Sequence, residues 1–396
     1  MGTFSGNSVP DSPPSSFDAI LGGPFLRVTA ANFLFFLCFA SFFLLPKHLH
    51  EIGADEEQIG DIMAVFGLAA TPLTLLVGKL VDRFRRRPIF LAGAALMAAS
   101  SASFALISHL SPMLYVLRVL QGLAFACCFT SASTLAADLA PVDRRAQALG
   151  IFGIFTLITH GLAVSMAELI EKRVGFPALF VIVSGWALLA AFLFRRVPET
   201  RHAATPARGS SLLALVKNPH LYPSMVVSLL AGSGFGAALT FVPVLGEARH
   251  WQHVSVFFLA YTAAAVTVRI VGGRLADVAG RRRVVLPSLA VFAVALAAIG
   301  RVQSEGGLAL AGLAFGAGHG LLYPALNALV VDASAAEDRG KAMALYNSAF
   351  NAGVTGGNVL FGRIADAYGY ANMFALAGLG IAGALAFFWR KSVPGT

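Results

Sequence analysis

The sequence predicts an all-α membrane protein with twelve transmembrane helices in two pseudo-symmetric bundles of six. Three observations lead to this prediction. Apolar stretches of about 20 residues, the length that spans a bilayer, recur along the whole chain. Only 12% of the 396 residues are charged, against about 25% in soluble domains. Glycine and charged landmarks of the first half also recur about 195 residues later.

The expected spans follow one another from end to end. Their limits are 25–45, 58–80, 88–108, 112–139, 146–169, 176–195, 222–245, 253–276, 284–302, 307–331, 340–364 and 371–390. Several are rich in Gly and Ala, which allow helices to pack closely in lipid. The stretch between the sixth and seventh spans is longer, contains Pro, Gly and Arg, and is typical of a linker. We expect one short amphipathic helix in it, at 211–217.

The spans divide the chain into four parts. We expect a disordered cytoplasmic tail at 1–24, because this stretch is rich in Ser, Pro and Gly and lacks the features of a signal peptide. A six-helix bundle at 25–196 follows, then a cytoplasmic linker at 197–220 and a second six-helix bundle at 221–391.

The two halves repeat each other. The matching landmarks are Gly78 with Gly273, Asp82 with Asp277, Asp143 with Asp338, and Gly175 with Gly369. Such a repeat of parallel halves implies two similar bundles about an axis along the membrane normal.

Lys and Arg predict the orientation. One set of connections carries basic clusters at 83–87, 144–145, 195–217, 274–283 and 339–341. The opposite set carries only Lys47, Lys172, Arg173, Arg249, Arg301 and Arg363. By the positive-inside rule, the first set faces the cytoplasm. With an even number of spans both termini lie there too. The net charge of +9 then reflects membrane topology, and we expect no nucleic-acid partner.

The strongest motif lies between the second and third spans and returns between the eighth and ninth. The two copies read GKLVDRFRRR, with Gly78, Asp82 and Arg86, and GRLADVAGRRR, with Gly273, Asp277 and Arg281. The pattern resembles the loop signature of the major facilitator superfamily of secondary transporters. Arg85 stands where that family usually has Gly. The resemblance covers nearly the whole chain.

The chemistry of this motif suggests a gate. Gly78 allows two helices to approach closely, and an Asp beyond a helix end can face the positive N-terminus of a neighbouring helix. Arg86 can pair with Asp138, and Arg281 with Asp332. The resemblance implies that these contacts hold the cytoplasmic side closed. The alternative is a topology signal with a solvated charge run, but topology alone requires only the Arg residues.

Arg118 and Gln121 in the fourth span, within RVLQGLAFA, resemble the Arg-containing fourth-helix motif that the family associates with proton coupling. An Arg inside a membrane is costly unless it faces a cavity or a partner. The alternative is an Arg that snorkels to the interface. The same alternatives stand for Arg269 in the eighth span, which can also pair with a carbonyl group.

The tenth span carries His319, Tyr323 and Asn327 at i, i+4 and i+8, on one helix face. The family resemblance implies that the first, fourth, seventh and tenth helices surround the substrate, so we expect these side chains to line its cavity. The other candidates for this cavity are Asn32, Arg118, Gln121 and Phe235. For Asn347, Asn351 and Asn358 of the eleventh span we expect hydrogen bonds between helices instead.

The coupling group is harder to identify, because no Asp or Glu lies at the middle of the first, fourth, seventh or tenth span. An imidazole titrates near physiological pH, so His160 and His319 are candidates, with a packing hydrogen bond as the alternative. Glu168, near the outer end of the fifth span, is a candidate that can also cap the interface. The proton-coupling candidates are therefore Arg118, His160, Glu168 and Arg269, beside His319. The fifth span lacks the Gly-Pro motif of many drug/proton antiporters, which weakens an antiport interpretation.

The resemblance implies a secondary transporter that works by alternating access, similar in layout to the bacterial sugar-efflux and drug-efflux branches. We expect a monomer in the bacterial inner membrane that exports a small organic solute with protons as the coupling ion; uptake is the alternative. A membrane-embedded enzyme or sensor is not expected, because the sequence has no Gly-x-Ser-x-Gly, His-Glu-x2-His or Walker-type loop. The three cysteines lie in apolar stretches, and we expect neither a metal nor a cofactor.

Overall fold

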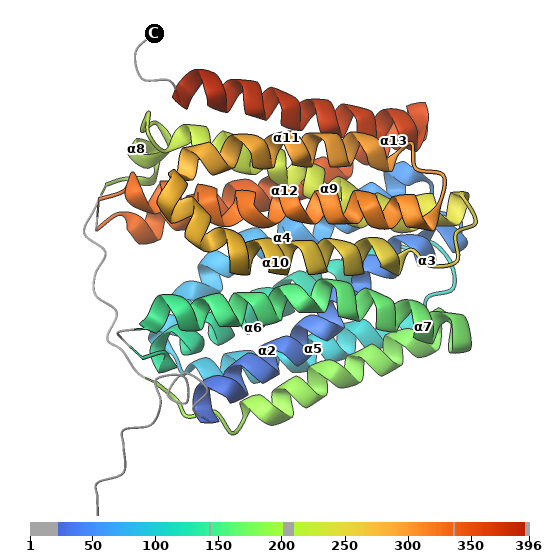
Figure 1. Cartoon of the computed structure of the whole chain (residues 1–396). Coiled ribbons are helices and arrows are strands. Elements are labelled where there is room, and N and C mark those ends of the chain that lie inside the picture. The colour runs from blue at the N-terminus through green and yellow to red at the C-terminus, as the bar shows by residue number, and fades with distance from the viewer. Residues whose placement is uncertain (1–22, 142–143, 201–209, 336, 393–396) are drawn as a thin grey trace, which may run out of the picture.

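The computed structural model describes residues 23–141, 144–200, 210–335 and 337–392. The regular elements in these ranges are helices (Figure 1). They are α2 (Gly23–Ser41), η1 (Phe42–Leu44), α3 (Leu45–Glu51), α4 (Glu56–Arg83), α5 (Arg86–Ser103), η2 (Phe104–Leu106), α6 (Met113–Leu139), α7 (Arg145–Phe194), α8 (Leu212–Val216), α9 (Tyr222–Ala248), α10 (Ser255–Ala279), α11 (Arg281–Ile299), α12 (Glu305–Asp332) and α13 (Arg339–Ser392).

Nine helical stretches of the described chain are long and apolar enough to cross a membrane. Two of them are double, because α7 turns back at Gly175 and α13 at Gly369. The helix α10 adds a crossing with a shorter apolar part, Ser255–Val271. The sum is the twelve crossings that the sequence predicts. The short helix expected at 211–217 is also confirmed, as α8.

Both turns depend on glycine. Gly175 has φ 79° and ψ 170°, and Gly369 has φ 75° and ψ 165°. L-residues with a Cβ rarely adopt this backbone conformation, whereas glycine adopts it without steric cost. The sequence repeat thus reproduces one sharp turn between the fifth and sixth crossings of each half.

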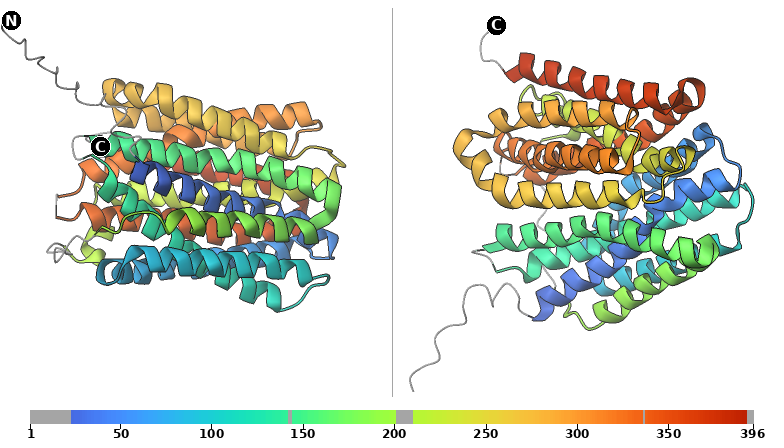
Figure 2. Two further views of the ribbon diagram at one scale, coloured as in Figure 1. Left: turned by 90° about the horizontal axis from the view of Figure 1, so that it is seen from below. Right: turned by 45° about the vertical axis from the view of Figure 1, so that its right-hand side comes forward.

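The helices form two bundles that lie side by side (Figures 1 and 2). One half consists of α2 to α7 and the other of α9 to α13. The halves meet where α4 contacts α13 and where α7 contacts α10. These two contacts are equivalent under the repeat. The exact limits of the halves as units stay a prediction, because linker residues 201–209 and tail residues 1–22 lie outside the described part.

The outward faces of the helices are apolar. Leu188, Leu310 and Leu379 expose 55%, 68% and 65% of their surface, respectively. Such large exposed apolar side chains are unfavourable in water, but they match the hydrocarbon of a bilayer. The polar side chains within the crossings must therefore find partners inside the bundle.

Glycine allows the closest helix pair of the second half. A Cβ on Gly353 of α13 would overlap the backbone carbonyl oxygen of Leu229 of α9, and a Cβ on Gly232 would overlap that of Phe350. By contrast, a Cβ on Gly356, one turn further along α13, would meet no atom of the described residues within 4 Å. Small residues bring the two backbones together at the first site.

These two positions give a matched test of packing. We expect Gly353→Ala to lower the stability of the purified protein by about 1–3 kcal/mol, because the added methyl group forces α9 and α13 apart. Gly356→Ala should leave the melting temperature unchanged or raise it, since alanine is the better helix former. Thermal unfolding in detergent compares the two variants; equal melting temperatures would contradict the close approach of α9 and α13.

Candidate functional site

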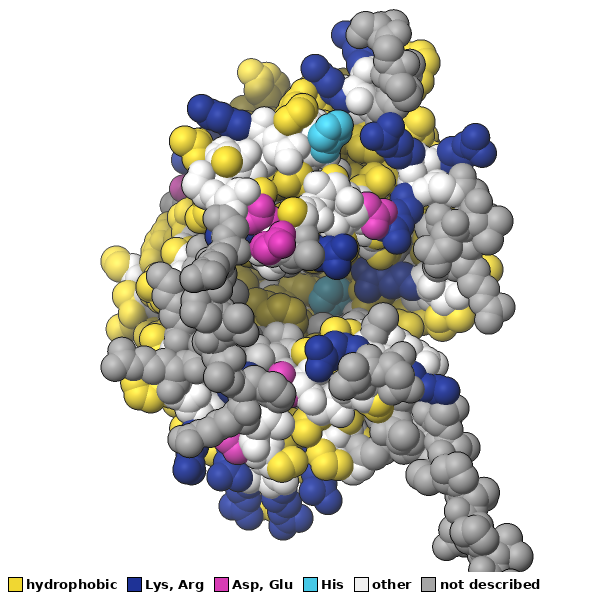
Figure 3. Space-filling view, turned by 90° about the vertical axis from the view of Figure 1, so that its left-hand side faces the viewer, with side chains coloured by type: hydrophobic (Ala, Val, Ile, Leu, Met, Phe, Trp, Pro, Cys, Tyr) yellow, Lys and Arg dark blue, Asp and Glu magenta, His cyan; other side chains and the backbone are white. Residues whose placement is uncertain are grey.

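The two ends of the bundle differ in character. The Arg-rich end is where α4, α6, α10 and α12 finish, and the far end is where the same helices begin. Figure 3 shows the Arg-rich face, with Lys and Arg side chains around a hollow that separates the two halves. A histidine lies at the floor of this hollow, with a Lys or Arg side chain beside it.

The expected partners of Arg86 and Arg281 are present at the Arg-rich end. Arg86, which is 6% exposed, forms an ion pair with Asp138. Its Nη1 also donates to Thr200 Oγ1 at 2.6 Å, and Thr200 Oγ1 donates in turn to Asp138 at 2.6 Å. Arg281 pairs with Asp332 and donates to the carbonyl oxygen of Ala328 at 2.8 Å.

These ion pairs join neighbouring helices of one half, α5 with α6 and α11 with α12. They are formed while the space between the halves is hollow, so they do not by themselves hold the halves together in this conformation. Among the residues whose side chains the structure describes, a Cβ on Gly78 would meet no atom within 4 Å, so the close approach expected at Gly78 is not seen with them. Asp82, Gly273 and Asp277 lie outside the residues whose side chains the structure describes.

Sequence reasoning missed a second carboxylate at this end. Glu199, just after α7, accepts from the backbone N–H groups of Arg86 and Arg87 at the start of α5. A carboxylate stabilises a helix N-terminus by pairing with its free N–H groups. Nothing in the local sequence around Glu199 indicates this contact, because 112 residues separate the partners.

Arg118 is buried deep in the first half and is 4% exposed, which excludes snorkelling in this conformation. Its Nη1 donates to Gln121 Oε1 at 2.9 Å, and Nη2 lies 3.5 Å from the carbonyl oxygen of Met63 on α4. The guanidinium also lies 4.9 Å from the ring centre of Phe66, a cation–π distance. Gln121 extends the set by donating to Ser101 at 3.4 Å. The groups that contact the charged guanidinium of Arg118 are thus an amide, a carbonyl and an aromatic ring, all of them neutral.

Phenylalanines surround this region. Phe125 is the centre of the group, with ring centroids 4.9 Å from Phe39, 5.5 Å from Phe66 and 5.7 Å from Phe36. These four residues, from α2, α4 and α6, form what we call the Phe cluster. Asn32 of α2, expected in the cavity, donates from Nδ2 to Thr156 of α7 at 2.9 Å within the same half, and its Oδ1 is buried without a partner in the described part of the chain.

The second half has a different centre, the imidazole of His319. It is 5% exposed and stacks on Phe235, with ring centroids 4.5 Å apart. Both of its ring nitrogens are buried and have no hydrogen-bond partner in the described part of the chain. Phe315 and Phe350 complete the surroundings, with ring centroids 6.1 and 5.8 Å from the imidazole. We call these four residues the His319 cluster.

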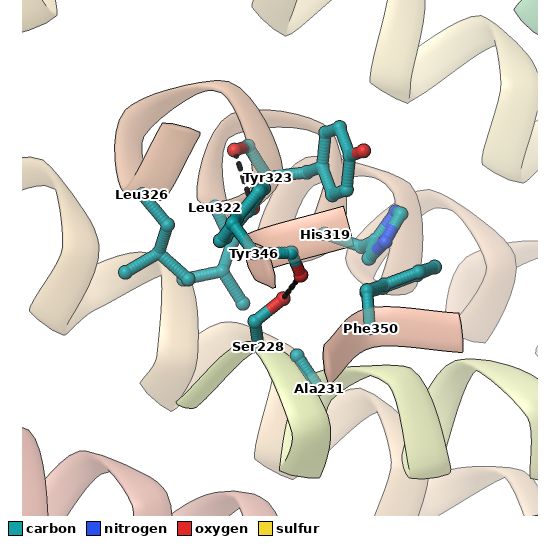
Figure 4. Close-up of a pocket in the computed structure, with 8 residues that line it drawn as sticks. All are labelled: Ser228, Ala231, His319, Leu322, Tyr323, Leu326, Tyr346 and Phe350. Atoms are coloured by element: carbon teal, nitrogen blue, oxygen red, sulfur yellow. Dashed lines mark hydrogen bonds between the residues drawn. The ribbon is translucent and has the colours of Figure 1, made fainter. Parts of the chain in front are cut away.

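A small pocket borders the His319 cluster (Figure 4). In this conformation the space is too narrow to hold a small organic ligand, whose sites typically measure roughly 300–1,000 Å³. Eight residues line it: Ser228, Ala231, His319, Leu322, Tyr323, Leu326, Tyr346 and Phe350. The hydroxyl groups of this pocket have partners, since Tyr346 donates to the Tyr323 carbonyl at 2.8 Å and Ser228 to the Tyr346 carbonyl at 3.3 Å.

The remaining polar residues of the tenth and eleventh spans mostly bond between helices. Tyr323 donates to Asn347 at 2.6 Å, and Thr240 donates to Asn358 at 3.1 Å. Asn351 is exposed, whereas Asn327 is partly buried on α12.

His160 and Arg269 lie near the seam between the halves. His160 of α7 packs on Phe43, with ring centroids 5.2 Å apart, and faces Tyr261 of α10 across the seam at 6.3 Å. Arg269 donates from Nε to the carbonyl oxygen of Gly320 at 3.2 Å, which is one of the contacts expected for it. It lies close enough to His160, His319 and Tyr261 for its charge to act on all three.

Glu168 joins the two halves at the far end and is 5% exposed. Its carboxylate accepts from the backbone N–H of Val254 at 2.8 Å and from that of Ser255 at 3.3 Å, and also from the Ser255 hydroxyl. These donors form the N-terminus of α10. Lys172 lies 3.8 Å from Glu168 and donates to the carbonyl of Gln252. A carboxylate of one half therefore caps a helix of the other.

Arg363 forms the corresponding contact of the second half. It pairs with Glu57 at 3.2 Å and with Asp61 at 3.5 Å in the first two turns of α4. Tyr370 adds a hydrogen bond to Glu56 at 2.7 Å. Glu168 and Arg363 are 195 residues apart, which is the offset of the repeat. We call the two contacts the Glu168 clasp and the Arg363 clasp.

The clasps explain the shape of the molecule. The polar contacts described here between the halves lie at the far end, where His50 and Glu247 also approach to 3.4 Å. Backbones are close there as well, since a Cβ on Gly362 would lie 2.7 Å from the Glu56 carbonyl oxygen. The bundle is therefore closed at the far end and hollow at the Arg-rich end.

The family model of the Major Facilitator Superfamily matches residues 28–278 and 253–396. A "Multidrug resistance protein MdtL" of Klebsiella pneumoniae (strain 342) is 29% identical over 173 residues, which are 42% of this chain and 44% of that protein. Its namesake from Shewanella oneidensis is 31% identical over 159 residues, 40% of each chain. The matched region thus spans less than half the length of these relatives.

Two solved structures are similar in fold. The crystal structure of the nucleoside transporter NupG has a TM-score of 0.79 at 14% identity, covering 93% of this chain and 99% of that chain. A bacterial homologue of the human lysosomal transporter Spinster, in an inward-facing and unoccupied conformation, has a TM-score of 0.75 at 14% identity, covering 96% and 98%. At these identities the likeness shows the fold.

The clasps give a test with an internal comparison. We expect Glu168→Ala to increase the population with an open far end about tenfold or more, because a buried charged hydrogen bond is worth about 1.5–3 kcal/mol. Arg363→Ala should change it only a few-fold, since exposed ion pairs are worth about 0.2–1 kcal/mol. Distances between spin labels on the far ends of α7 and α10 measure the opening.

Glu171→Ala is the control, because Glu171 lies one turn from Glu168 but pairs with Lys47 of its own half, at 3.1 Å. Its distance distribution should match that of the unsubstituted protein. If Glu168→Ala and Glu171→Ala give the same distribution, the Glu168 clasp does not hold the halves together.

Proposed function

The chain belongs to the major facilitator superfamily, and we propose that it exports a small organic solute from the cytoplasm by alternating access, coupled to inward movement of protons. It is a transporter, and a multi-pass protein of the inner membrane, rather than an enzyme. In this proposal the Arg-rich end faces the cytoplasm, with both termini. A single copy is sufficient, because one chain contains both halves.

The observation that carries the proposal is the uneven closure of the seam. The clasps join the halves at the far end, and the Arg-rich face is hollow between them (Figure 3). A passage open at one end only is what alternating access requires of each of its states. The opposite state needs the clasps to break and the Arg-rich ends of the two halves to meet. The basic motif loops lie at that end, in agreement with the gating role we propose for them.

Two observations support export of an organic molecule. The relatives named as multidrug resistance proteins are about 30% identical over two-fifths of the chain. The Phe cluster and the His319 cluster also supply apolar and aromatic walls on both sides of the seam. Apolar walls with a few polar groups are typical of sites for small organic ligands.

Proton coupling requires a group that can gain and lose a proton along the passage. His160 faces the seam and its Nδ1 is buried without a partner in the described chain. The carboxylate of Glu168 lies in the far-end contact, where protonation would weaken its hold on α10. We propose that these two groups carry the proton, and that Arg118 supports them by fixing α4 against α6.

Proteoliposomes with an imposed pH gradient test the proposal directly. For one proton exchanged per neutral solute, a gradient of one pH unit sustains an accumulation of up to about tenfold. The expected result is that a protonophore abolishes this accumulation, measured over a set of chemically diverse solutes. Accumulation that persists without the gradient contradicts proton coupling, and accumulation only in the reverse direction identifies uptake instead.

Arg118→Ala tests the role of the buried positive charge in transport, independently of the pH gradient. We expect transport to fall at least tenfold, because the α4–α6 contact and the charge beside Phe66 are both lost. Arg301→Ala is the control, since Arg301 is exposed at the far end and its side chain bonds only to the Ala297 carbonyl, one turn away, among the contacts described here. Normal transport by folded Arg118→Ala, checked by its gel-filtration profile, would exclude a role for this residue.

A further inference from the structure

The middle of the seam contains an unusual group of buried polar atoms. His160 Nδ1, the hydroxyl groups of Tyr261 and Thr262, and both ring nitrogens of His319 are buried without hydrogen-bond partners in the described part of the chain. Buried polar groups in native proteins are nearly always hydrogen-bonded, so an unsatisfied one requires an explanation. Several together mark a place where ordered water or a bound polar molecule would supply the missing hydrogen bonds.

These atoms are close together. The ring centroids of His160 and Tyr261 are 6.3 Å apart, as are those of Tyr261 and His319, and Thr262 follows Tyr261 on α10. The group spans both halves, because His160 belongs to α7 and the others to α10 and α12. We call these four residues the seam group.

Aromatic rings surround the seam group with flat apolar surfaces. Phe235 stacks on His319 and lies 6.1 Å from Tyr261, whereas Phe43 packs on His160 and lies 6.3 Å from Phe258 across the seam. Parallel and edge-on aromatic contacts favour planar aromatic ligands. The unpartnered nitrogens and hydroxyl groups of the seam group can form hydrogen bonds with polar substituents at the edge of the ligand's ring.

The charges near the seam group favour an anion. Arg269 is held next to His319 by its hydrogen bond to the Gly320 carbonyl oxygen, at 3.2 Å, so its positive charge lies near the seam group. On α12 the nearest carboxylates, Glu305 and Asp332, are 13 or 14 residues from His319, which is about 20 Å along a helix. A cationic ligand would therefore meet a positive charge and no nearby carboxylate from α12.

We infer that the seam group binds a planar aromatic organic anion, such as an aromatic carboxylate, as the transported solute. The ring lies against Phe235 and Phe43, the carboxylate pairs with Arg269, and the imidazole and hydroxyl groups supply the hydrogen bonds. This inference rests on the transport function proposed above and narrows its substrate class.

Three ligands that share one aromatic group, naphthalene, and differ in charge test this inference. The probes are 1-naphthoate, 1-naphthylmethanol and 1-naphthylmethylammonium, titrated calorimetrically into the purified full-length protein. We expect naphthoate to bind at least tenfold more tightly than the ammonium compound, with the alcohol between them. Equal or tighter binding of the cation, or no binding of any of the three, overturns the inference.

Two substitutions locate the site. Arg269→Gln should remove the preference for naphthoate over the alcohol while the alcohol still binds. His319→Phe keeps an aromatic ring but removes both ring nitrogens. It should lower the binding affinity for each of the three probes about tenfold. His48→Phe is its control: His48 is also a buried imidazole with two unpartnered nitrogens in the described chain, but it packs on Phe176 and Phe180 of the first half and not on a residue of the seam group.

If His48→Phe weakens binding as much as His319→Phe, the seam group is not the site. Naphthoate flux into proteoliposomes separates this inference from the wider proposal. Flux of other solutes without naphthoate binding leaves the transport function intact and rejects the substrate class. Naphthoate binding without flux of any solute keeps the site and rejects transport.

Discussion

The structure depends on one constraint: a polar group inside a bilayer has no water to bond with. Helices satisfy their own backbones, but polar side chains must find partners within the bundle. The partners found here fall into three groups, which are contacts inside a half, contacts between the halves at the far end, and the unsatisfied seam group. Arg118 illustrates the first group, because its charge is compensated by an amide, a carbonyl and a ring rather than by a carboxylate.

The sequence alone is sufficient to predict the fold and the ion pairs that the two copies of the basic motif make. The twelve crossings follow from apolar length, and the turns at Gly175 and Gly369 were visible as repeated landmarks. Arg86 with Asp138 and Arg281 with Asp332 were predicted as ion pairs and are formed. Their roles as gates stay predictions, since the side chains of Asp82 and Asp277 lie outside the described part.

Contacts between the halves were beyond sequence reasoning. Glu168 was identified as a candidate for proton coupling or as an interface cap, but its partners are backbone N–H groups 86 and 87 residues away, which carry no residue-type signal. Arg363 was counted only as a topology signal. Asn32 is polar and in the first span, which predicts a place in the cavity; its amide nitrogen bonds to Thr156 of α7, whereas its Oδ1 has no partner in the described chain. Polarity in a span predicts that a partner exists, and only the packing decides which one.

The two halves place a charged clasp residue at the same position of the repeat, but the charge has the opposite sign in each half. Equivalent positions carry an acid at Glu168 and a base at Arg363, and both hold the start of the second helix of the other half. An acid can do so by accepting from free N–H groups, whereas a base needs acids in the first turns, and α4 supplies Glu57 and Asp61. The two clasps therefore differ in strength, because one is buried and the other half exposed, so opening of the far end is governed mainly by Glu168.

Opening the far end must then be driven by something that distinguishes the two states. A ligand shifts a conformational equilibrium only by the difference in its binding free energy between the states. A solute that touched one half alone would bind both states equally and would move nothing. The seam group includes His160 from one half and Tyr261 and His319 from the other, so rocking of the halves changes the contacts of any molecule bound there. This makes the seam, rather than the interior of either half, the place where binding can be coupled to movement.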